Sequence, residues 1–309
     1  MLKQHFSVSD PEGYQIYVYR WLPEQASRRK AVLQIVHGLM EHAARYERFA
    51  YSLTEAGYIV YASDLRGHGR TGNNQRELGY AGHDGFNWMV QDLYQIAQTI
   101  KTEHPNLPVI IFAHSMGSLL AQSYVTKYGK EIEGLILSGT QGRQGVLLQV
   151  ATLLAKLEIL KKGAKAPSKF LNKLVFGQYN KAFLPARTSF DWLSRDEQEV
   201  DKYLNDPYCG GIPSAGLFHD LFRGIKEMHK KEHMRRIPIG LKTYLIWGEK
   251  DPVGNEGKSI YRLIKEYKRL GLKNFSYKCY KDGRHEMLNE TNRTEVTNDL
   301  INWLDRNYC

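Results

Sequence analysis

Short runs of β-branched and aromatic residues alternate with longer helical patterns along most of this chain. The runs span residues 4–8, 14–21, 31–36, 58–62, 109–112, 134–138, 243–247 and 275–280. Strands that alternate with helices predict βαβ units, and hence a mostly parallel eight-stranded sheet flanked by helices, an α/β fold. The turn at residues 10–13 separates the first two runs and predicts that they pair in antiparallel fashion.

Helices are expected where apolar residues recur every three or four positions. These segments are 43–56, 86–102, 116–128, 257–270 and 294–307. Between about residues 140 and 236 the alternation breaks and no strand–helix pair can be read. Because an irregular loop rarely exceeds about 15 residues, we expect a helical cap inserted into the sheet. The expected organisation is a core first half (1–140), a cap or lid (141–236) and a core second half (237–309).

Composition restricts the class of protein. The 309 residues are 42% hydrophobic and 25% charged, as in globular proteins, which excludes a disordered or collagen-like chain. No apolar run approaches 18 residues, and Met1–Gly13 lacks the apolar core of a secretory signal. Cys209, Cys279 and Cys309 are far apart and in no metal-ligand spacing. We therefore expect a reducing, cytoplasmic location without structural disulfides.

Positive charge is concentrated in the expected cap. Residues 151–182 hold seven lysines and one glutamate, which is +6 of the net charge of +10. The lysines are Lys156, Lys161, Lys162, Lys165, Lys169, Lys173 and Lys181. A solvated helix face and peripheral contact with an anionic membrane both remain open. No motif for RNA or DNA is present, so a nucleic-acid partner is not expected.

One helical face of the expected cap is apolar. Its residues are Val146, Val150, Leu153, Leu154, Leu157 and Leu160. This stripe is expected either to pack on the core or to form the wall of an acyl tunnel.

Ligands of open parallel sheets bind at the carboxyl ends of the strands, so polar residues that follow strands are candidates for chemistry. The candidates are His37, Asp64, Ser115, Asp251 and His285. Ser115 lies in Ala113-His114-Ser115-Met116-Gly117, between a strand and a helix. Small residues on both sides of a serine permit the sharp turn that exposes a nucleophilic hydroxyl. The alternative is a serine that only caps the helix.

Asp251 and His285 each follow a later strand. The order Ser…Asp…His, with each residue after its own strand, is the chain order of α/β-hydrolases. Ser115, Asp251 and His285 are therefore the predicted catalytic triad. Individually, the aspartate could be an ordinary turn residue and the histidine a structural loop residue.

The segment after residue 36 is expected to stabilise the oxyanion of an acyl-transfer intermediate. Backbone N–H groups are suited to this task because they are fixed in place before the negative charge develops. The expected donors are the N–H groups of Leu39 and Met116. His37, Asp64 and His68 are interpreted as structural, and no metal or organic cofactor is expected.

The sequence resembles the monoacylglycerol lipase and lysophospholipase group of serine α/β-hydrolases, the serine aminopeptidase-like group. The matching segments are His37-Gly38-x-x-Glu41-His42-x-x-Arg45-Tyr46, Asp64-x-x-Gly67-His68-Gly69, the segment around Ser115, the turn at Asp251 and His285-Glu286-Met287-Leu288. Leu39-Met40 replaces a glycine-rich loop and Ala113 a glycine; neither change removes a backbone donor.

The resemblance implies that Glu41 and Arg45 line the polar end of a substrate pocket. His114, beside the nucleophile, is a further candidate for substrate binding. The expected reaction is hydrolysis of a single-chain lipid ester, a monoacylglycerol or a lysophospholipid, through an acyl-enzyme on Ser115.

Three alternatives remain open: a small-molecule esterase, a serine aminopeptidase, and a non-enzymatic ligand-binding or scaffold protein. An aminopeptidase needs carboxylates for the free amine of its substrate. The acidic residues available in the cap are Asp191, Asp196, Glu197, Glu199 and Asp201. The acyl length, head group, oligomeric state and role of Cys209 stay undetermined.

Overall fold

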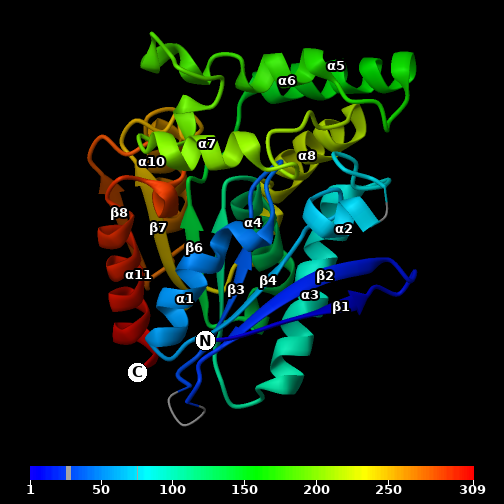
Figure 1. Cartoon of the computed structure of the whole chain (residues 1–309). Coiled ribbons are helices and arrows are strands. Elements are labelled where there is room, and N and C mark those ends of the chain that lie inside the picture. The colour runs from blue at the N-terminus through cyan, green and yellow to red at the C-terminus, as the bar shows by residue number, and fades with distance from the viewer. Residues whose placement is uncertain (26–28, 75) are drawn as a thin grey trace.

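An eight-stranded sheet forms the centre of the computed structural model, which describes residues 1–25, 29–74 and 76–309 (Figure 1). The strands are β1 (Leu2–Ser9), β2 (Gln15–Leu22), β3 (Val32–Val36), β4 (Ile59–Ser63), β5 (Val109–His114), β6 (Gly134–Ser138), β7 (Lys242–Gly248) and β8 (Phe275–Tyr280). Their order is β1-β2-β4-β3-β5-β6-β7-β8. Strand β2 is antiparallel to β1 and β4, and the remaining pairs are parallel. The predicted mostly parallel sheet is confirmed.

Helices cover both faces of this sheet (Figure 1). Helices α1 (Glu47–Glu55) and α11 (Arg293–Tyr308) pack on one face, and α3 (Gly85–Glu103), α4 (Met116–Tyr128) and α10 (Lys258–Arg269) on the other. In β3, Val32 and Val36 belong to one apolar cluster, whereas Leu33 and Ile35 belong to the opposite one. Because successive side chains of a strand alternate between faces, a strand buried on both faces needs apolar residues on each of them. Gln34 is the exception in β3, and its Nε2 donates to the Leu93 carbonyl at 3.0 Å.

Two details near the amino-terminal half differ from the sequence-based expectation. The helix expected over 43–56 is a 3₁₀ turn, η2 (Ala43–Tyr46), followed by α1, because Tyr46 leaves helical geometry at φ −89° and ψ 4°. A short helix, α2 (Gly69–Asn74), follows the glycine-rich loop. The Asp64 carboxylate accepts the N–H of Arg70 in its first turn, at 2.7 Å.

Residues 141–236, here called the cap, contain helices and turns and no sheet strand in the part of the chain that the structure describes. The helices are α5 (Val146–Lys162), α6 (Lys169–Phe176), α7 (Glu197–Asn205), α8 (Ala215–Met228) and α9 (Lys231–Met234), with 3₁₀ turns η4 (Tyr179–Phe183) and η5 (Asp191–Leu193). Outside the cap, 3₁₀ turns η3 (Gly129–Glu131) and η6 (Met287–Asn289) follow α4 and β8. Helices α5 to α8 lie beyond the end of the sheet at which the parallel strands finish (Figure 1).

The apolar stripe of α5 does not lie where the sequence suggested. Both expectations for it, packing on the core and lining a tunnel, are wrong for most of its residues. Val146, Val150, Leu153, Leu157 and Leu160 are between 49% and 75% exposed. The opposite side of α5, with Ala151, Ala155 and Ile159, packs against Phe218 and Phe222 of α8. Small residues on this inner face permit close helix packing, so the larger ones remain in solvent.

Among the described residues, no helix is both long enough and apolar enough to cross a bilayer.

Candidate active site

The turn between β5 and α4 holds Ser115 in a strained conformation. Its backbone has φ 51° and ψ −121°, a region that non-glycine residues rarely occupy. The Ser115 N–H donates to the carbonyl of Ser138 at 3.0 Å, which fixes the turn to β6. A Cβ at Gly117 would lie 2.4 Å from the carbonyl oxygens of Val36 and His37, so glycine is needed where α4 meets the end of β3.

His285 lies within hydrogen-bonding distance of both Ser115 and Asp251. The Ser115 Oγ is 2.8 Å from Nε2 of His285, and Nδ1 of His285 is 3.0 Å from both carboxylate oxygens of Asp251. His285 and Asp251 are buried, whereas Ser115 remains partly exposed. The structure therefore brings together three residues that are separated by up to 170 positions in the sequence.

The environment of His285 favours its protonated form. Burial opposes a charge on the ring, but the negative charge and hydrogen bonds of Asp251 outweigh burial and raise the pKa of His285 above its usual value. The rings of His114 and Trp192 lie 4.7 and 5.1 Å from the His285 ring. These two neighbours restrict the orientation of the imidazole.

The segment Gly38–Met40 lies against the serine turn. A Cβ at Gly38 would be 3.1 Å from Cβ of Ser115. Among the described residues, neither the N–H of Leu39 nor that of Met116 donates to another residue. Glu41 holds this segment in place, since its Oε1 accepts the Gly38 N–H at 2.6 Å.

Two cap residues, Tyr203 and Gly210, bind Met40, the last residue of the segment Gly38–Met40. The sequence analysis selected neither of them. Met40 has φ 52°, and its carbonyl accepts the N–H of Gly210 at 3.1 Å and the hydroxyl of Tyr203 at 3.0 Å. Neither residue belongs to a motif or spacing that would identify it as part of the active site. Their relation to Met40 exists only after the cap is folded over the sheet.

A buried ion-pair cluster lies beside the triad. Arg45 donates to Glu41 at 2.6 Å and to both oxygens of Glu286 at 2.8 and 2.7 Å. The arginine lowers the pKa of Glu286 although burial acts to raise it. Glu286 is a site residue that the sequence analysis did not select, and its position next to His285 was the available signal.

A cavity of about 380 Å³ lies between the cap and the carboxyl ends of the strands. From the core it is lined by Gly38, Leu39, Met40, Glu41, His114, Ser115, His285 and Glu286. From the cap the apolar and aromatic contributors are Phe176, Phe190, Trp192, Leu193, Tyr203 and Pro213. Glu41 and His114 therefore lie on the cavity wall. Arg45 lines a smaller pocket that shares His114 and Glu286 with this cavity, and its guanidinium is held by Glu41 and Glu286. Its expected place at the polar end of a substrate pocket stays a prediction.

The residues interpreted as structural make contacts of that kind. His37 accepts the Leu65 N–H at Nε2, 2.9 Å away, and so ties the loop after β3 to the loop after β4. Burial lowers the pKa of His68 to about 4, and its Nδ1 lies 2.8 Å from the Arg66 carbonyl. Asp64 accepts the Ala43 N–H at 2.8 Å.

Known proteins resemble this chain over nearly its whole length. The family described as "Serine aminopeptidase, S33" matches residues 27–292. A monoacylglycerol lipase of Mycolicibacterium smegmatis is 29% identical over 302 residues, which cover 94% of this chain and 93% of that protein. A probable lysophospholipase L2 of Haemophilus influenzae is 26% identical and covers 72% of this chain and 69% of that protein.

A solved structure has the same fold. The thermostable carboxyl esterase of Bacillus coagulans, in complex with glycerol, superposes with a TM-score of 0.92 at 26% identity, and each chain is covered completely. Family match and fold agree with the geometry around Ser115. The chain belongs to the serine aminopeptidase S33 family and is a serine hydrolase with the α/β-hydrolase fold.

Proposed function

We propose that this protein hydrolyses esters of single-chain lipids, either a monoacylglycerol or a lysophospholipid, through an acyl-enzyme on Ser115. The observation that carries the proposal is the hydrogen-bonded series Ser115–His285–Asp251 at the base of a cavity with an aromatic and apolar cap side. Proteins named monoacylglycerol lipase and lysophospholipase among the relatives support this substrate class.

In the proposed mechanism His285 accepts the Ser115 proton as Oγ attacks the ester carbonyl. Asp251 holds the imidazole in position and stabilises the imidazolium. The N–H groups of Leu39 and Met116 bind the oxyanion. His285 then protonates the departing alcohol, and a water molecule that it deprotonates releases the fatty acid and regenerates Ser115.

The cavity supports a lipid substrate over a peptide with a free amine. Its only acidic lining residues among those described are Glu41 and Glu286, and Arg45 already neutralises both. The acidic cap residues considered for an aminopeptidase, Asp191, Asp196, Glu197, Glu199 and Asp201, all lie outside this lining. Asp196, for example, pairs with Arg293 at 2.6 Å and caps α7.

Replacing the nucleophile tests the reaction itself. Ser115→Ala should abolish ester turnover and labelling by a fluorophosphonate probe, while circular dichroism shows an intact fold. Ser123→Ala, a buried serine two turns further along α4, serves as the control and should retain both. Activity of more than a few per cent in Ser115→Ala would refute the assignment. Absence of labelling in the unmodified protein would favour a binding-only protein.

A chain-length series tests the substrate. Turnover of p-nitrophenyl acetate, octanoate and palmitate should be detectable at all three lengths and should favour the longer acyl chains. Peak activity on acetate with none on octanoate would indicate a small-molecule esterase instead. Release of amino acids from β-naphthylamides would indicate a peptidase.

We further propose peripheral contact of the cap with an anionic membrane. Besides the exposed stripe of α5, the neighbouring helix α6 exposes Phe170 and Leu174, which are 48% and 46% exposed. All seven lysines of residues 151–182 are exposed on the same segment. An apolar strip bordered by cations suits the boundary between acyl chains and anionic head groups.

A cytoplasmic location is proposed on separate grounds. All three cysteines are free thiols in the structure, which suits a reducing compartment.

A further inference from the structure

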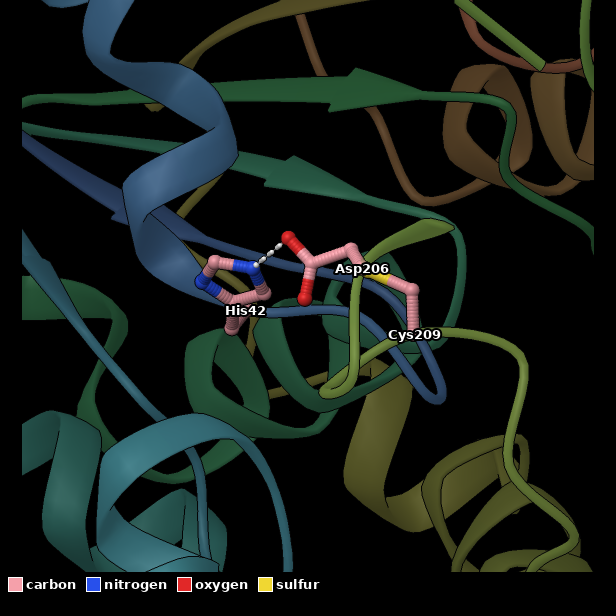
Figure 2. Close-up of side chains that lie close together, drawn as sticks. All are labelled: His42, Asp206 and Cys209. Atoms are coloured by element: carbon pink, nitrogen blue, oxygen red, sulfur yellow. Dashed lines mark hydrogen bonds and ion pairs between the residues drawn. The ribbon is translucent and has the colours of Figure 1, made fainter. Parts of the chain in front are cut away.

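His42, Asp206 and Cys209 converge beside the catalytic cavity, and the mechanism uses none of them (Figure 2). His42 precedes η2 on the core side, whereas Asp206 and Cys209 lie in the cap loop after α7. The Nε2 of His42 is 2.9 Å from Oδ2 of Asp206. One ligand atom from each residue lies within 4.8 Å of those of the other two.

The three side chains are of the types that coordinate Zn²⁺ in proteins. An imidazole nitrogen, a carboxylate oxygen and a thiolate sulfur all bind Zn²⁺, at about 2.0–2.3 Å. Bonds of that length, arranged tetrahedrally, separate neighbouring ligand atoms by roughly 3–4 Å. The present separations therefore need only small side-chain movements to enclose such an ion.

The rest of the site leaves these donors available. Asp206 receives the Tyr208 N–H at 2.9 Å on Oδ1, which orients its carboxylate toward His42. The Cys209 sulfur makes no hydrogen bond to any residue in the described ranges. His42 is 8% exposed and Asp206 and Cys209 are partly exposed, so an ion and a water ligand can enter from the cap side.

We propose that His42, Asp206 and Cys209 form a binding site for a divalent transition metal of the Zn²⁺ class, with water as the fourth ligand. Binding displaces the thiol proton of Cys209 to solvent and shifts the ring proton of neutral His42 from Nε2 to Nδ1. The His42–Asp206 hydrogen bond is thereby replaced by two metal–ligand bonds. No oxidation or reduction is involved. The sequence could not indicate this site, because 164 positions separate His42 from Asp206.

At this location a bound metal would link the cap to the core. His42 is two residues after Met40, and Cys209 directly precedes Gly210, whose N–H donates to the Met40 carbonyl at 3.1 Å. A metal held by His42 and Cys209 would therefore connect the chain just after the segment Gly38–Met40 to the cap loop that follows α7. It would restrain movement of the cap relative to the catalytic serine.

Cobalt titration tests the site independently of ester hydrolysis. The parent is the full chain with Cys279→Ser and Cys309→Ser, which removes the two exposed thiols, after treatment with a chelator. We expect one Co²⁺ per chain, with a near-ultraviolet sulfur-to-cobalt charge-transfer band. Adding Cys209→Ser should remove the band and weaken Co²⁺ binding at least tenfold.

A second variant separates ligation from folding. Asp206→Asn keeps the size and the hydrogen-bonding ability of the side chain but loses the carboxylate charge, and should weaken Co²⁺ binding at least tenfold while circular dichroism is unchanged. A parent without the charge-transfer band, or a band that persists after Cys209→Ser, would overturn the proposal. Unchanged affinity in Asp206→Asn would do the same.

Discussion

Two buried carboxylates lie near His285, and different partners give them different tasks. Asp251 faces Nδ1 of the imidazole, where it raises the pKa of His285 against the effect of burial. Glu286 adjoins the same histidine in sequence, but Arg45 engages both of its oxygens. Asp251 therefore provides the larger charge effect and the hydrogen bonds that act on the imidazole, while Glu286 adds a smaller effect that also raises the pKa of His285.

The raised pKa of His285 predicts the pH dependence of turnover. His285 must be neutral to accept a proton, so activity falls as the pH decreases through its pKa, and a raised pKa places this loss at a higher pH than for an ordinary histidine. Asp251→Asn should move the acid limb of kcat/KM to lower pH and reduce kcat on the order of 10⁴-fold. The measurement is a pH–rate profile with a soluble ester.

Asp282→Asn provides the control for this experiment. Asp282 lies in an exposed turn three residues before His285, and asparagine tolerates its positive φ of 55°. The control should keep the wild-type profile. An acid limb that stays in place in Asp251→Asn would contradict the role assigned to that aspartate.

At the level of elements, α5 shows why an apolar face does not by itself identify a core. Its stripe at positions 146, 150, 153, 157 and 160 has helical periodicity, yet it is exposed. The inner face was concealed in the sequence because it includes two alanines, Ala151 and Ala155. Small side chains let α5 approach α8 closely, and periodicity alone does not report this.

Serine substitutions in the stripe test its proposed contact with membranes. Leu153→Ser with Leu157→Ser should reduce co-sedimentation with anionic phospholipid vesicles roughly tenfold, because two half-exposed leucines lose their apolar area. Turnover of soluble p-nitrophenyl acetate should not change. Leu2→Ser on β1, which is 52% exposed in the parent, is the control. Equal vesicle binding by all three proteins would argue against the proposed contact.

At the level of the whole molecule, the cap forms part of the catalytic geometry as well as a cover. The cap binds the segment Gly38–Met40 through the Met40 carbonyl. It also binds the loop that carries His285 and Glu286. The N–H of Glu286 donates to the Leu193 carbonyl at 2.8 Å, and that of His285 to the Trp192 carbonyl at 3.4 Å. Displacement of the cap would therefore disturb both His285 and the segment Gly38–Met40, which carries the proposed oxyanion donor Leu39.

Tyr203→Phe tests this coupling with the loss of a single hydroxyl. Without its hydrogen bond, Met40 is less firmly held at its positive φ, and kcat should fall roughly tenfold, less than the 10²–10³-fold loss of an entire oxyanion donor. The KM of a soluble ester should change little. Tyr261→Phe on α10, half-exposed, is the control. A change in KM alone would show that Tyr203 serves only the substrate cavity.

The order of strands and helices, the position of the serine turn and the order Ser…Asp…His were all readable in the sequence. Each depends on local properties: side-chain periodicity, the small residue at Gly117, and polar residues directly after strands. These properties act within a few residues. The predicted ends of most core strands and helices therefore agree with the observed ends to within one or two residues.

Contacts between elements that are distant in the sequence were decided only by the tertiary structure. Examples are the ion pair of Arg45 with Glu286, the hydrogen bond from Tyr203 to Met40, the packing of α5 on α8 and the convergence of His42 with Cys209. The energies of these contacts depend on the distances between elements, and sequence periodicity does not determine those distances.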